Sequence, residues 1–164
     1  YITDEWSAFE ADDAGTMAAM KEIIVLQRNS GFTASTTYSQ VSSQASHPIL
    51  AGVPTSFKLP VAGGNIGFAR VYSSNQPAVL MTSTEGDAVA VREFSNGGRA
   101  IGFQNAGNYN GSTVLSDVNI QKLYSNAIQS GYAINVVQTA GLPRVRTCSI
   151  EAYHSRTLSI WCGY

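Results

Sequence analysis

Residues 77–104, PAVLMTSTEGDAVAVREFSNGGRAIGFQ, decide the fold because three short β-type runs follow one another here. Two groups of residues that favour hairpin turns, Glu85-Gly86 and Ser95-Asn96-Gly97, separate the runs. In the second run, valines alternate with alanines and an arginine, which predicts a half-buried strand. The stretch therefore predicts an antiparallel meander. Its strands are expected at 77–84, 87–94 and 98–104.

A helix is expected on each side of this meander. Residues 4–22 carry acidic side chains early and Lys21 late, as the helix dipole favours, although Gly15 interrupts the pattern. Ser116 is expected to cap a second helix that continues to about Gln129. Its apolar residues recur at helical spacing and predict one buried stripe. The stripe consists of Val118, Ile120, Leu123, Tyr124, Ala127 and Ile128.

The other segments give weaker local signals. The apolar run 23–27 predicts a buried strand that ends at the turn residues 29–31. The Ser/Thr-rich segment 33–46 is expected to be a loop or an exposed edge, and 54–60 a turn-rich connection. Near the C-terminus, 144–153 and 157–162 are expected to be two strands that turn at His154-Ser155.

Composition narrows the class of protein. The 164 residues suit one domain, with a core at 1–131 and a β extension of the same domain at 132–164. A net charge of −1 argues against nucleic acid binding, and no apolar run approaches the ~20 residues that span a membrane. Only 13% of residues are charged, and Ser and Thr supply much of the polarity. We therefore expect an exported, processed chain that is extracellular or at the cell surface.

The two cysteines, Cys148 and Cys162, fall on the two expected C-terminal strands. Facing positions on a hairpin have the Cα separation that a disulfide needs. Closing so short a loop contributes roughly 3 kcal/mol in the chain-entropy description. We expect a Cys148–Cys162 disulfide, which would leave the chain without a thiol for catalysis; the alternative is two free core thiols.

The region from His47 to Gln129 resembles part of the class I glutamine-amidotransferase-like domains, including the ThuA-like group of exported proteins. The resemblance rests on HPILAGV (47–53), the meander, NGGRAIGFQNAG (96–107) and LSDVNIQKLYSNAIQ (115–129). It implies an α/β fold with a flavodoxin-like three-layer core, incomplete or remodelled at the N-terminus, and followed here by the β-hairpin extension.

The resemblance also indicates where catalysis would lie in active relatives. Their nucleophile is a cysteine upstream of this region, and a histidine follows the strand that corresponds to 98–104. This chain has no cysteine before Cys148, and Gln104 and Asn105 stand at the end of that strand. The thiolate and base that acyl transfer needs are therefore missing from their expected positions. We expect no catalytic residues and no cofactor.

The loop after the last meander strand is the best binding candidate. Its amides and one aromatic side chain are groups that contact carbohydrate or peptide, and its glycines permit close backbone approach. The alternative is a polar connection between strand and helix. The candidate residues are Gln104, Asn105, Asn108, Tyr109 and Asn110, of which Asn110 also begins a glycosylation sequon.

Metal binding is not expected. His47 precedes Pro48 and is expected to cap a turn, and His154 to be an exposed turn residue. The acidic residues Glu5, Glu10, Asp12 and Asp13 lack the spacing of a calcium loop and are expected to form a solvated helix face.

The leading function hypothesis is a non-catalytic extracytoplasmic domain that binds or assembles at the cell surface. Its expected partners are further copies of itself, other surface proteins or carbohydrate. The alternative is a hydrolase or amidotransferase-like enzyme for sugar or amide substrates, with catalytic parts on a removed segment. A third possibility is an all-β secreted module with only an accidental resemblance in its core.

Overall fold

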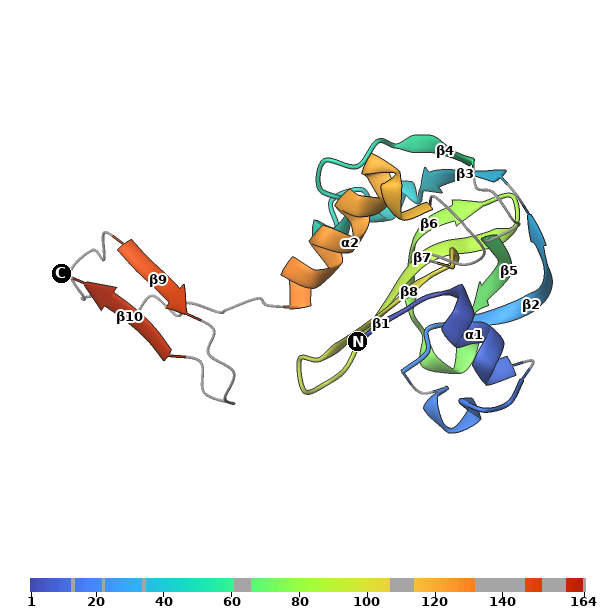
Figure 1. Ribbon diagram of the computed structural model, residues 1–164, viewed down its shortest axis with the longest axis horizontal. Helices are drawn as coiled ribbons and strands as arrows, with labels where there is room; N and C mark the ends of the chain where they lie inside the picture. The colour runs from blue at the N-terminus through green and yellow to red at the C-terminus, as the bar shows by residue number, and fades with distance from the viewer. Residues whose placement is uncertain are drawn as a thin grey trace. The chain divides into compact units, whose positions relative to one another are not determined.

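A computed structural model describes residues 1–12, 14–21, 23–33, 35–60, 66–106, 114–131, 147–151 and 159–163 (Figure 1). The chain divides into two compact units, Tyr1–Ala133 and Ile134–Tyr164. The elements of the first unit are β1 (Ile2–Thr3), α1 (Glu5–Asp12), η1 (Ala18–Met20), β2 (Leu26–Thr33), β3 (Ser35–Gln40), η2 (Ser42–Gln44), η3 (Pro48–Leu50), β4 (Ser56–Pro60), β5 (Ile66–Val71), η4 (Ser73–Asn75), β6 (Ala78–Ser83), β7 (Gly86–Glu93), β8 (Arg99–Phe103), η5 (Val114–Ser116) and α2 (Val118–Gly131).

The predicted meander is confirmed as β6, β7 and β8, which pair antiparallel in sequence order. They lie within a sheet of order β1-β8-β7-β6-β3-β4, in which β1 runs parallel to β8. A ribbon of β2 and β5 joins this sheet at one parallel pair, Ala69 opposite Gly86. Figure 1 shows β6, β7 and β8 side by side in the first unit.

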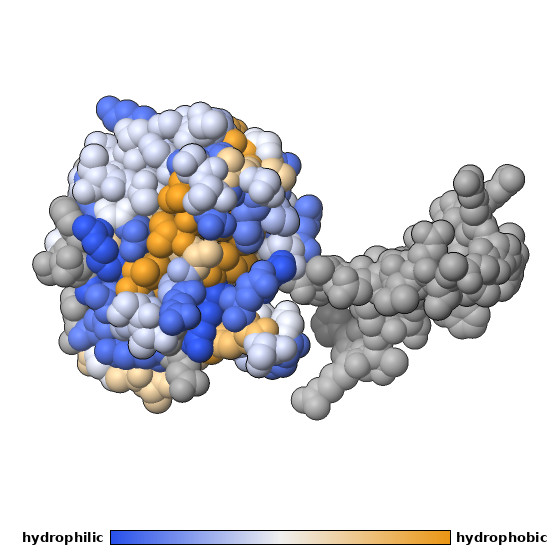
Figure 2. All heavy atoms as spheres, turned by 180° about the vertical axis from the view of Figure 1, so that it is seen from behind, coloured by the Kyte–Doolittle hydropathy of each residue, from blue (hydrophilic) through white to orange (hydrophobic). Residues whose placement is uncertain are grey.

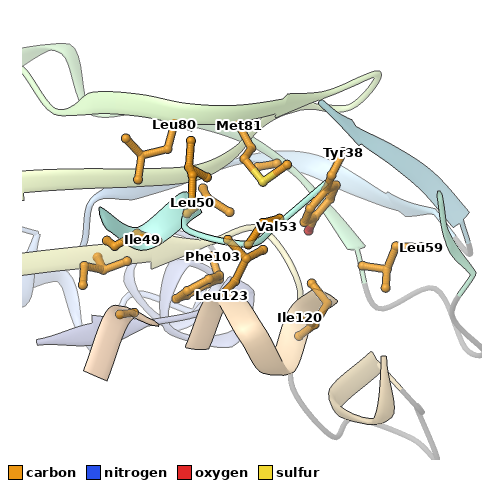
Figure 3. Packing of buried hydrophobic residues seen from close by; sticks show 14 of the residues in the cluster. Tyr38, Ile49, Leu50, Val53, Leu59, Leu80, Met81, Phe103, Ile120 and Leu123 are labelled. Atoms are coloured by element: carbon orange, nitrogen blue, oxygen red, sulfur yellow. The ribbon is translucent and has the colours of Figure 1, made fainter. Parts of the chain in front are cut away.

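Both faces of β7 are covered, so the half-buried strand predicted there was wrong. Residues 88–91 are at most 3% exposed. On one face, α2, η3 and β7 share a hydrophobic cluster, part of which Figure 3 shows around Phe103 and Leu123. On the other face, Val25 and Leu26 approach β8 so closely that a Cβ on Gly102 would lie 3.0–3.1 Å from their side chains. The missing side chain of Gly102 thus permits this second layer.

The segment 33–46, expected to be a loop or an exposed edge, contains β3, and the expected turn-rich connection 54–60 contains β4. β3 pairs with both β4 and β6, and its Thr36 and Tyr38 are buried. The predicted turn at 29–31 instead lies inside β2, where the register shifts between Arg28 and Phe32 and Gly31 has a φ of +78°. Residues typical of a turn thus form an irregularity within a paired strand. The sequence pattern alone does not distinguish such an irregularity from a turn.

The two α-helices differ from their predicted extents for local reasons. α1 ends at Asp12, and Gly15 has a φ of +74°, which an α-helix does not tolerate. α2 is capped by Asp117 rather than Ser116, since the Asp117 carboxylate accepts from two backbone N–H groups, of Asn119 and Ile120.

The predicted buried stripe of α2 is only partly correct. Ile120, Leu123 and Ala127 are buried, whereas Val118 and Ile128 are exposed. The Asn126 amide donates to the carbonyls of Ile49 and Ala51, so it joins α2 to the η3 segment.

The second unit contains β9 (Thr147–Glu151) and β10 (Ser159–Gly163), which pair antiparallel as predicted. The turn expected at His154-Ser155 lies outside the described residues. Whether 132–164 belongs to the same folding domain as the core stays a prediction.

The fold is α/β, with a strand-rich sheet and two α-helices among the described residues. The flavodoxin-like detail is not confirmed, because the strand pairs are antiparallel except β1 with β8 and β5 with β7. No helix in the described ranges combines the length and apolar character needed to cross a membrane.

Candidate functional site

The candidate binding residues separate into two groups. Gln104 and Asn105 directly follow β8 and are completely buried, so the exposed position predicted for them was wrong. The reason is that their backbone stays within the sheet region: the Gln104 carbonyl accepts from Gly67, and Asn105 bridges to Ile66. Asn108, Tyr109 and Asn110 lie outside the described residues, and so does the predicted glycosylation of Asn110.

Strand direction brings several chain segments to the edge where β8 ends. β1 is parallel to β8, so the start of α1 follows at the same edge. β6 is antiparallel to β7, as is β8, so the turn at Thr84-Glu85 also lies there. In open α/β sheets the carboxyl ends of parallel strands are the usual position of a functional site. We call Tyr38, Ser83, Gln104, Asn105 and Tyr124 the β8-edge cluster.

Asn105 connects the sheet to α2. The Tyr38 hydroxyl donates to Asn105 Oδ1 over 3.4 Å, and Asn105 Nδ2 donates to the Tyr124 hydroxyl over 3.4 Å. The Tyr124 ring stacks on Phe103 with a centroid distance of 4.0 Å. Figure 3 shows the Tyr38 ring projecting from β3 into the core, with its hydroxyl at the tip. Both the oxygen and the nitrogen of the Asn105 side-chain amide therefore have internal partners.

The side chain of Gln104 forms a hydrogen bond with β6. The Ser83 hydroxyl donates to Gln104 Oε1 over 2.9 Å and accepts from the backbone N–H of Glu85 over 3.1 Å. Gln104 Nε2 has no hydrogen-bond partner among the described residues. A buried donor of this kind costs free energy unless some group accepts from it. Gln104 Nε2 is thus a donor of the cluster that has capacity for a further contact.

Glu85 forms the rim of the cluster. Its carboxylate accepts from the hydroxyls of Thr36 and Thr84, the latter at 2.7 Å. Burial would raise the pKa of Glu85, but these hydrogen bonds, together with those from Ser83 and a backbone N–H, outweigh burial and lower the pKa. Glu85 therefore stays ionised near neutral pH, so it cannot donate a proton there, and its lowered pKa makes it a weak base.

The tyrosines are equally unsuited to proton transfer near neutrality. Burial raises the pKa of Tyr38 far above its ordinary value, and the nearby charges add to the effect. Burial likewise raises the pKa of Tyr124, with the charge of Asp4 contributing. Both phenols keep their protons, so the cluster offers neutral hydrogen bonds and one fixed negative charge at its rim. Such hydrogen bonds can join the surrounding strands and helix to one another, or they can bind a polar ligand.

His47 has the capping role that its sequence context predicted. Its Nδ1 accepts from the backbone N–H of Ile49 over 3.2 Å at the start of η3. Burial lowers the pKa of His47, and the positive charge of Arg99 lowers it further. The neutral ring that accepts this bond is therefore the favoured form. His154 lies outside the described residues, within which no three metal-binding side chains gather.

The sequence missed a buried ion pair beside the cluster. Glu5, expected on a solvated helix face, is 3% exposed, and its Oε1 lies 3.3 Å from Arg28 Nε. Arg28 also lies over the Phe9 ring, 4.8 Å from its centroid. Gly67 leaves room for Glu5, because a Cβ there would lie 2.5 Å from Glu5 Cγ. In the sequence, the only indication of this close contact was Gly67, a glycine within a strand.

Comparisons with known proteins give the fold but no family. No protein family and no curated protein matches the sequence at a significant level. The fold is similar to a structure described as a cytoplasmic protein from Salmonella typhimurium, with a TM-score of 0.54 and 15% identity. The match covers 78% of this chain and 52% of the other, so this chain spans about half the length of that protein.

This comparison contradicts the predicted extracellular or cell-surface location, because the similar protein is described as cytoplasmic. The prediction rested on a low share of charged residues and many hydroxyl groups. Such a surface is hydrated equally well in any compartment, so composition was an unsound guide. The disulfide prediction consequently loses its support from the compartment and depends on strand register alone.

Proposed function

We propose that this chain is a non-catalytic binding or assembly domain built on a degenerate amidotransferase-like, remodelled flavodoxin-like core. The observation that carries the proposal is the complete burial of Gln104 and Asn105 at the end of β8. The resemblance would place a catalytic histidine there. In this chain the two amides hold β3, β6 and α2 together by hydrogen bonds. We infer that these residues stabilise the β8 edge and take no part in acyl transfer.

The sheet edge at β1, with the exposed apolar residues of α1, is the surface that we propose for assembly. β1 is the terminal strand in the described sheet order, and large apolar side chains are exposed there and on α1. Tyr1 is 74% exposed, Ile2 40% and Trp6 41%. The first unit also has a band of hydrophobic residues on the face that Figure 2 shows. An edge strand can pair with another chain, but β1 has only two residues, so the exposed apolar side chains would have to supply most of the contact.

A second copy of this chain is the occupant that we propose for this edge. Two identical edge strands can pair antiparallel about a two-fold axis, and each then covers the other's apolar side chains. Ile2→Lys should prevent this pairing, since a charged side chain on an edge strand opposes its own copy. Light scattering after size exclusion should show a dimer for the wild type at high concentration and a monomer for Ile2→Lys.

Val118→Lys is the matched control, because Val118 is also apolar and exposed but belongs to α2. We expect it to associate as the wild type does. A wild type that stays monomeric at high concentration contradicts the assembly proposal. Release of ammonia from glutamine by the purified chain would contradict the non-catalytic assignment, whatever its oligomeric state.

A further inference from the structure

The strand register of the second unit places its two cysteines opposite each other. β9 and β10 pair over five consecutive positions, and Cys148 is the partner of Cys162. Opposed Cα atoms on antiparallel strands are about 4.5 or 5.5 Å apart, according to the type of pair. A disulfide needs about 4.4–6.8 Å. Either pair type therefore places the two Cα atoms within the separation that a disulfide needs.

The same register sorts this hairpin into two faces. Opposed residues share a face, and positions two apart along a strand share it too. Cys148 and Cys162 therefore share one face with the opposed pair Ile150 and Ile160. The other face holds mainly polar residues: Thr147, Ser149, Glu151, Ser159, Trp161 and Gly163.

A two-stranded sheet such as β9–β10 would be stabilised by a covalent bond between its strands. The unit spans Ile134–Tyr164. A two-stranded hairpin by itself is only marginally stable in water. Among the residues of this unit, a cross-strand bond between its two cysteines is the stabilising device that the register supplies directly.

We propose that Cys148 and Cys162 are a redox site that closes a reversible cross-strand disulfide. Closure is a thiol–disulfide exchange with a small-molecule disulfide such as oxidised glutathione. The two S–H bonds of the protein break, and one S–S bond forms between Cys148 and Cys162. The small disulfide is reduced to two thiols and takes up both electrons and both protons. The proposal is independent of the compartment and of the proposed binding function.

The test incubates the full chain with oxidised glutathione, alkylates free thiols and digests the protein with trypsin without reductant. Arg156 lies between the two cysteines in the sequence, so cleavage there separates them. The expected product is peptide 147–156 joined to peptide 157–164, free of alkylation and separated by dithiothreitol. Alkylation of both cysteines, or glutathione bound to each of them, would overturn the proposal.

A register variant tests whether strand pairing causes closure. Cys162→Ser combined with Ile160→Cys keeps two cysteines on the same face but in a diagonal position, at roughly 7–8 Å. This separation exceeds the usual disulfide span, so closure should require at least about tenfold more oxidised glutathione. Closure at the wild-type concentration would contradict the role of register. The wild-type digest decides the pairing even if this variant does not fold.

Discussion

Gly86→Ala is expected to destabilise the first unit by roughly 3–5 kcal/mol, a large part of the about 5–15 kcal/mol by which folded domains are usually stable. Gly86 has a φ of +130°, which side-chain-bearing residues rarely adopt. A Cβ there would overlap the backbone carbonyl oxygen of Ala69, the residue that pairs with Gly86 where the β2–β5 ribbon joins the sheet. Urea denaturation followed by far-ultraviolet circular dichroism measures the loss.

Gly97→Ala is the matched control for this prediction. Gly97 also has a positive φ, +83°, but a Cβ there would meet nothing within 4 Å. Only the backbone penalty remains, so its cost should be about 1–2 kcal/mol. Equal effects of the two substitutions would show that the close approach of β5 to β7 is not present.

Arg28→Met is expected to cost about 3–5 kcal/mol, because it leaves the Glu5 carboxylate buried without its ion-pair partner. The side chains of Glu5 and Arg28 are 2% and 6% exposed, so water cannot replace the lost charge without opening the structure. Chemical denaturation of the purified variant measures the free energy of unfolding.

The double variant Glu5→Met/Arg28→Met separates the charge from the packing. Methionine keeps an unbranched side chain at both positions, so no charge is left unpaired and volume is largely retained. Its stability should lie within about 1 kcal/mol of the wild type, because replacing both partners of a buried pair is often neutral. A double variant as unstable as Arg28→Met would show that the loss comes from packing.

The sequence was sufficient to predict those elements whose structure depends on residues that are neighbours in the chain. The predicted turn at Ser95-Asn96-Gly97 joins β7 to β8, and the turn predicted at Glu85-Gly86 lies one residue earlier, at Thr84-Glu85, because hairpin geometry depends mainly on the turn residues themselves. β3 was missed because its Ser/Thr-rich sequence resembles a loop. It is a strand because β4 and β6 pair with it on both sides, which depends on distant parts of the chain.

The candidate site was located in the sequence but not correctly described. The end of the third meander strand was identified, and Gln104 and Asn105 do follow β8. Their burial depends on Tyr38, Ser83 and Tyr124, which come from three other elements. Amide-rich sequence near glycines is typical of an exposed loop, so no local pattern could predict internal hydrogen bonds at this position.

Gln104 and Asn105 lie inside the fold and support the β8 edge by hydrogen bonds. Hydrogen exchange of their side-chain amide groups in ¹⁵N-labelled protein measures this directly. Asn96, which is exposed in the β7–β8 turn, provides the reference. We predict exchange slower than that of Asn96 by about two orders of magnitude or more, as buried groups need local opening. Exchange of all three side chains at one rate would contradict the account.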